Sequence, residues 1–126
     1  MPGQFGDYMV AALMSLISQS TSASWMAAFF ADPQKADPRA VEVVGGSYAR
    51  QKPTFTRTDP KALTLAADIS FTLQPGTTVV AIGAFDSSVN GNFLYSDLLS
   101  TPRVFTTGGV YTVQAGEYVV GLQIPT

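Results

Sequence analysis

The stretch Leu63-Thr64-Leu65-Ala66-Ala67-Asp68-Ile69-Ser70-Phe71-Thr72-Leu73 decides the fold class of this chain. Every odd-numbered position in it is apolar, and the positions between them are small, polar or charged. Because successive side chains of a β-strand point to opposite faces, this period of two predicts one half-buried strand over residues 63–73. Pro75-Gly76 then predicts a turn.

Further short strands are expected on the C-terminal side of this stretch. The apolar runs predict strands at residues 78–85, 93–98, 103–106, 111–115 and 118–124. Turn residues separate these strands. One of the turns contains Asn90-Gly91, a pair that is typical of a tight hairpin. Turn signals at intervals of about 8 to 12 residues indicate a mainly β fold, an antiparallel β-sandwich of Greek-key or jelly-roll type.

One helix is expected ahead of the sheets, over residues 5–20, with Asp7 as its N-cap. Apolar residues recur there at the spacings 9, 13, 16 and 10, 13, 17, and small or apolar residues widen the stripe. A helix with so little polar surface must be covered by its own sheet or by a neighbouring subunit. After it we expect a buried strand at 24–31, a long loop at 32–46 and the β-sandwich at 47–126, all in a single domain, 1–126.

Composition excludes several classes of enzyme. The chain has no cysteine and no histidine, which rules out disulfide bonds, zinc sites of the His/Cys kind and a Ser-His-Asp triad. The acidic residues do not form a close pair on one predicted strand face, as glycoside hydrolysis would require. We therefore expect a non-enzymatic protein without a cofactor. Charged residues make up only 13%, against about 25% in typical soluble domains, as in proteins that pack against neighbours.

The basic residues are concentrated in one part of the sequence. All but one of the seven lie between positions 35 and 61, in a chain with a net charge of −2. This is too little positive charge for a nucleic-acid interface. The N-terminus lacks a basic n-region, and its apolar run is too short to span a bilayer. We expect neither a nucleic acid nor a membrane as partner, and synthesis and assembly in a cytoplasm.

One loop has the residue order of a calcium site. Asp86, Ser88, Asn90, Gly91 and Asp97 fall at positions 1, 3, 5, 6 and 12 of the calcium-loop pattern. Strands rather than helices are expected on both sides of it, so a hairpin is the better interpretation, and calcium binding stays open. The only tryptophan, Trp25, lies in an apolar run, which favours core packing over sugar stacking.

The segment Glu42-Val43-Val44-Gly45-Gly46-Ser47-Tyr48-Ala49-Arg50-Gln51 closes the predicted long loop. Its glycine pair turns the chain into an expected edge strand that carries Tyr48, Arg50 and Phe55. Pro53 supports an edge position because it has no N–H to donate. Since a strand and not a helix is expected to follow, the glycine pair is not a phosphate-binding loop.

The order of such segments resembles that of small virion structural proteins of tailed bacteriophages, described as head-decoration, minor tail or tail-fibre-like proteins. The segments that carry the resemblance are Phe30-Ala31-Asp32-Pro33, Glu42 to Gln51, Gln74-Pro75-Gly76-Thr77-Thr78-Val79, Gly83 to Leu94 and Phe105 to Val113. The resemblance implies a virion component that works by self-association and docking. The favoured role is a capsid decoration (cement) protein that stabilises the shell. The alternative is a minor tail or tail-fibre-like protein that binds a receptor or glycan.

The expected partners are the major capsid protein or tail proteins, together with further copies of this chain, with a trimer as the predicted homo-oligomer. Aromatic and basic residues near the helix start and in the long loop are the candidate assembly contacts. They are Phe5, Tyr8, Lys35, Arg39, Tyr48, Arg50 and Lys52.

Overall fold

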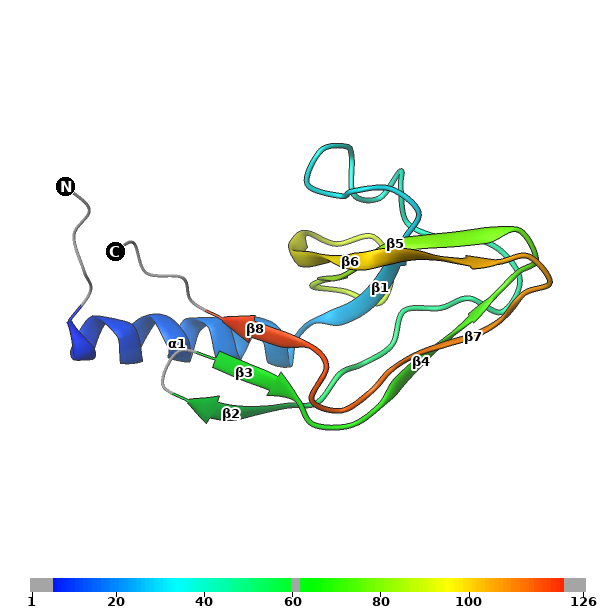
Figure 1. The fold of residues 1–126 in the computed structure, drawn as a ribbon. Helices are drawn as coiled ribbons and strands as arrows, with labels where there is room; N and C mark the ends of the chain where they lie inside the picture. The colour runs from blue at the N-terminus through cyan, green and yellow to red at the C-terminus, as the bar shows by residue number, and fades with distance from the viewer. Residues whose placement is uncertain (1–5, 60–61, 122–126) are drawn as a thin grey trace.

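The computed structural model of the chain describes residues 6–59 and 62–121 (Figure 1). Within them, one helix is followed by strands alone. The elements are α1 (Asp7–Ser22), β1 (Trp25–Phe29), β2 (Phe55–Asp59), β3 (Ala62–Leu65), β4 (Ile69–Leu73), β5 (Thr77–Phe85), β6 (Phe93–Phe105), β7 (Gly109–Val113) and β8 (Val119–Gly121). The predicted fold, mainly β with antiparallel, sandwich-like sheets and one leading helix, is confirmed.

The strands form small antiparallel sheets of order β1-β5-β6, β2-β3-β8 and β4-β7. In Figure 1 the β1-β5-β6 sheet lies above β4 and β7, while β2, β3 and β8 continue toward α1. The main core lies between these layers, where Met26 and Ile82 of the first sheet pack with Phe71 and Tyr111 of the β4-β7 pair. The strand β5 is the central strand of its sheet, and its sequence is correspondingly apolar.

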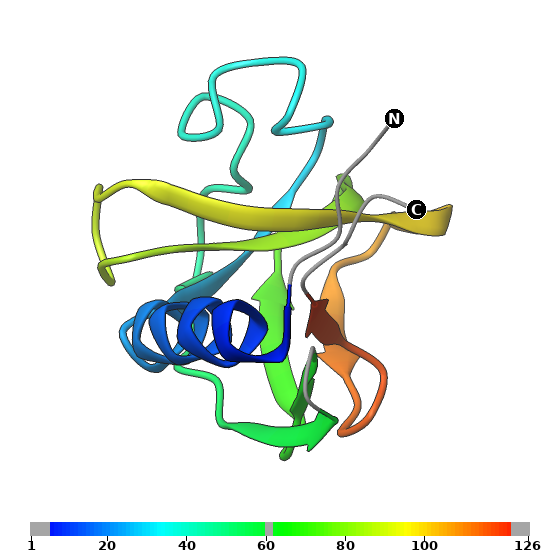
Figure 2. The same ribbon diagram turned by 90° about the vertical axis from the view of Figure 1, so that its left-hand side faces the viewer.

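The helix α1 packs through one face only. Val10 and Met14 are buried against Leu63 of β3, and Ile17 packs beside them. Figure 2 shows α1 nearly end-on beside the sheets. The carbonyl of Gly6 accepts the N–H of Val10 at 3.0 Å, so Gly6 holds the N-cap position that we predicted for Asp7. Over the described residues, no helix combines the length and hydropathy needed to cross a bilayer.

The predicted strand 63–73 is two strands, because its halves pair with different partners. β3 lies between β2 and β8, whereas β4 pairs with β7. At the break, the N–H of Ala66 donates to the Thr54 carbonyl at 2.7 Å, and the Asp68 carboxylate accepts the N–H of Ala115 at 2.7 Å. The period of two nevertheless holds on both sides of the break, since Leu63 and Phe71 both point into the core.

The strands predicted at 93–98 and 103–106 are one strand, β6. Leu98 pairs with Ala81 and Arg103 pairs with Val79, so residues 99–102 lie opposite Val80 alone. This bulge lies on the outer strand of the sheet, where Pro102 costs no ladder hydrogen bond. The turn signal at Thr101-Pro102 therefore marks a bulge and not the end of a strand.

The expected edge strand that carries Tyr48, Arg50 and Phe55 is wrong in its first part, since the regular sheet resumes only at Phe55. Residues 30–54 instead run along the outer edge of β1 and pair with it at isolated points, Phe29 with Glu42 and Met26 with Gln51. The Val43 N–H donates to the Ala28 carbonyl at 2.9 Å. The long loop is thus longer than predicted, and it covers the edge of β1 without forming a strand.

Candidate functional site

Arg50 is the centre of an internal polar network. Its guanidinium forms a bidentate ion pair with Glu42, Nε to Oε2 at 2.9 Å and Nη2 to Oε1 at 2.8 Å. Nη1 donates to the carbonyls of Ser87 at 2.8 Å and Asn90 at 2.6 Å. The guanidinium carbon lies 3.8 Å from the centroid of the Phe85 ring. Only 6% of the Arg50 side chain and 12% of the Glu42 side chain are exposed, so this cation joins the loop, the 86–92 hairpin and the core.

Tyr48 extends the network to β1. Its hydroxyl donates to Glu42 Oε2 at 2.8 Å and accepts the backbone N–H of Ala28 at 3.0 Å. Its ring stacks on Phe71 with centroids 5.9 Å apart. Burial raises the pKa of the Tyr48 hydroxyl, and the neighbouring Glu42 carboxylate raises it further. The hydroxyl therefore stays protonated and keeps the irregular loop attached to the sheet.

The predicted assembly contacts fall into two groups. Tyr48 and Arg50 belong to the internal network, a structural role that the sequence analysis did not predict. Tyr8, Lys35, Arg39 and Lys52 are exposed. The Lys52 ammonium donates to the Ser24 carbonyl at 3.3 Å and lies 5.5 Å from the Trp25 ring centroid. Phe5 lies outside the described residues. The use of any of these residues in assembly stays a prediction.

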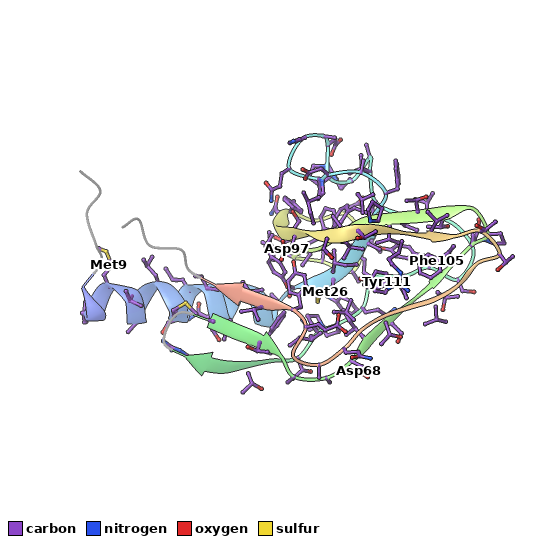
Figure 3. The ribbon with its side chains drawn as sticks, viewed as in Figure 1. Met9, Met26, Asp68, Asp97, Phe105 and Tyr111 are labelled. Carbon is purple, nitrogen blue, oxygen red and sulfur yellow. The ribbon has the colours of Figure 1, made fainter. Side chains whose placement is uncertain are left out.

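Several apolar side chains are exposed on one side of α1. Tyr8 is 89% exposed, Met9 51% and Leu16 60%, and Ala12 lies between them. At about 100° per residue, these four positions fall within one third of the helix circumference, opposite the packed positions. Asp7 is the only charged residue of α1. Figure 3 shows Met9 on the part of α1 that extends away from the sheets. We call Tyr8, Met9, Ala12 and Leu16 the outer face of α1.

The 86–92 loop is a hairpin, as predicted. Asn90 and Gly91 have φ values of 57° and 81°, which is the backbone conformation that such turns require. The Asp86 carboxylate accepts the backbone N–H of Asn92 at 2.7 Å and its Nδ2 at 3.0 Å. These hydrogen bonds lower the pKa of Asp86. Asp97 pairs with Ile82 in the sheet, and residues 6–59 and 62–121 contain no cluster of three acidic side chains that could hold a metal ion.

The prediction that Trp25 packs in the core is wrong. It is the one residue of β1 that is only half-buried, and it takes no part in the hydrophobic clusters of the described residues. Trp25 lines an open hollow of about 620 Å³ between the long loop and the 86–92 hairpin. Its lining also includes Arg39, Val44, Ser88, Val89, Asn90 and the Arg50–Glu42 pair.

The family described as podophage GP4 fiber I protein gp80 matches residues 6–121. The chain belongs to this family. The match covers α1, every strand, the Arg50 network and the hollow. As a fiber I family member, the chain is a structural protein of a tailed-bacteriophage virion, and the resemblance found in its sequence is confirmed at that level. No individual curated protein matches the chain.

Proposed function

We propose that this chain is a non-enzymatic structural module of a virion fibre that attaches to the particle through the outer face of α1. The family match over residues 6–121 carries the proposal. The sandwich holds the helix by its opposite face, through Val10 and Met14, so the outer face stays available for a partner. The partner is a virion structural protein or a further copy of this chain.

The chemistry of the outer face supports docking rather than solvation. Contiguous exposed apolar side chains on a soluble protein mark interaction sites. Full burial of a side chain such as Leu or Met contributes about 1.5–3 kcal/mol. Tyr8, Met9 and Leu16 together therefore supply several kcal/mol to an interface. No charge has to be desolvated, because α1 carries none beyond Asp7.

The proposed placement in a fibre differs from the capsid-decoration role that the sequence analysis favoured. The family description names a fiber protein, which supports the tail-fibre-like alternative. A closed homo-oligomer, with three copies as the predicted number, suits a fibre built around a symmetry axis. The lack of histidine and cysteine supports a role without catalysis.

Copy number tests the placement. Quantitative mass spectrometry of purified virions, calibrated on the major capsid protein, should find this chain in tens of copies or fewer. A protein of the fibres is expected in a copy number that is a small multiple of the symmetry of the tail. A number in the hundreds, in proportion to the capsid protein, would contradict the fibre placement and favour decoration of the shell.

A further inference from the structure

We propose that the hollow beside Trp25 binds a saccharide that carries a carboxylate group. It is bounded by the long loop, the start of β1 and the 86–92 hairpin, and its volume of about 620 Å³ is in the usual range for small-ligand sites. The inference does not depend on the proposed placement in a fibre. The hollow is separate from the outer face of α1, whether the chain is placed in a fibre or on the capsid shell.

Trp25 supplies the aromatic surface that a sugar ring needs. The other residues of β1 are fully buried, whereas Trp25 is half-buried and lines the hollow. Where Trp25 lines the hollow, its ring offers an apolar surface on which the C–H face of a pyranose can pack. The Lys52 ammonium lies 5.5 Å from its ring centroid and brings a positive charge close to this platform.

The charges around the hollow favour an anionic ligand. Arg50 and Glu42, which both line the hollow, neutralise each other. Arg39 is exposed in its wall, and within residues 6–59 and 62–121 its guanidinium has no ion-pair or hydrogen-bond partner. An arginine in that state can bind a carboxylate through two parallel hydrogen bonds. The hollow is therefore a positive site on a chain whose net charge is −2.

The hairpin adds neutral polar groups on a fixed backbone. The side chains of Ser88 and Asn90 line the hollow and have no hydrogen-bond partner among the described residues. Arg50 holds their backbone through the carbonyls of Ser87 and Asn90. Space at Gly91 is so limited that an added Cβ would lie 2.5 Å from Asp86 Oδ1. A rigid wall with free hydroxyl and amide groups suits sugar hydroxyls, because little ordering cost remains on binding.

A peptide strand fits the hollow less well than a saccharide does. Adding a strand to a sheet requires an open edge. Here β5 pairs with one edge of β1, and residues 42–51 already occupy the other. The lining of the hollow combines the Arg50–Glu42 ion pair with apolar side chains such as Val89. The geometry thus points to a compact polar ligand with one apolar face, which is the character of a uronic acid.

The sole tryptophan makes the test direct, because Trp25 emission reports on the site itself. We would titrate the full chain with D-glucuronate, with D-glucose and with acetate at constant ionic strength. The expected result is a saturable change in emission with glucuronate at millimolar concentrations, an affinity typical of a weak single-sugar site. Glucose should bind about tenfold more weakly, because it lacks the charge that Arg39 pairs with.

Two variants that each remove one positive charge test whether Arg39 is the cation that binds the carboxylate. Arg39→Gln should weaken glucuronate binding about tenfold, whereas Lys35→Gln, on the same exposed loop but outside the hollow, should leave it unchanged. Both substitutions are at exposed positions, so thermal unfolding should be unaffected. The proposal is overturned if glucuronate gives no saturable response, if acetate binds as tightly as glucuronate, or if both variants weaken binding equally.

Discussion

Replacement of Arg50 by alanine tests whether the Arg50–Glu42 ion pair is buried, as it is in the structure. The substitution removes both hydrogen bonds to the Glu42 carboxylate and both bonds to the hairpin carbonyls. Glu42 then remains as a charge with only 12% of its side chain exposed and with the Tyr48 hydroxyl as its remaining side-chain donor. The loop and the hairpin would also lose their common anchor.

The expected loss is about 3–5 kcal/mol in the free energy of unfolding, the range for removal of one partner from a buried ion pair. Surface ion pairs contribute about 0–1 kcal/mol, so the two situations are well separated. Replacement of both partners, Arg50→Met with Glu42→Leu, should restore much of the loss, because no charge is then left buried without its partner.

Urea unfolding, followed by far-UV circular dichroism, measures this loss. Arg39→Ala is the matched control, since it removes an exposed guanidinium nearby and should change stability by at most about 0.5 kcal/mol. A loss below about 1 kcal/mol for Arg50→Ala, similar to that of the control, would refute the buried network. It would mean that Arg50 is solvated, as a surface contact would be.

Further predictions concern α1, the core and alkaline pH. Leu16→Glu should change the stability of the isolated chain by at most about 0.5 kcal/mol but abolish its incorporation into virions. Met14→Ala, on the packed face, should lower the free energy of unfolding by about 2–5 kcal/mol. Urea unfolding measures the effect on stability, and a virion incorporation assay measures the effect on docking. Gly83→Ala should cost about 1–3 kcal/mol in the same unfolding assay, because its Cβ would collide with the Tyr95 carbonyl oxygen; a loss near zero would contradict the close approach of β5 and β6. Burial raises the pKa of Tyr95 to about 12, so the folded chain holds this proton more tightly than the unfolded chain does. Its contribution to stability is complete below pH 10 and should fall between about pH 10 and 12 by about 1.4 kcal/mol per pH unit. Tyr95→Phe should make the measured decline shallower, and an unchanged slope would contradict this assignment.

The sequence predicts local structure well wherever one physical rule acts alone. The alternation through residues 63–73 gives the correct buried face, and Asn90-Gly91 gives the correct hairpin. The break between β3 and β4 could not be predicted, because it arises from pairing with partners distant in the sequence. The same holds for Pro102, since only the register of β6 against β5 shows that it lies in a bulge.

The candidate site was less predictable, because burial decides the role of each side chain. Arg50 and Tyr48 are residue types that often form surface contacts. Here both side chains instead pair inside the protein with Glu42, which lies eight residues before Arg50 and six before Tyr48. The presence of an opposite charge at that spacing was the available signal. On α1, the even spread of apolar residues left the packed face undetermined, so Tyr8 was predicted as a contact and Leu16 was not.

Oxidation of Met9 is the most direct test of docking through α1. Peroxide oxidises exposed methionine faster than buried methionine, and Met9 is 51% exposed whereas Met14 and Met26 are fully buried. Mass spectrometry of the free chain should therefore find Met9 oxidised well ahead of both internal references. If the outer face of α1 attaches the chain to the particle, Met9 in purified virions should be oxidised as slowly as Met14. Equal rates of Met9 oxidation in virions and in the free chain would contradict the account.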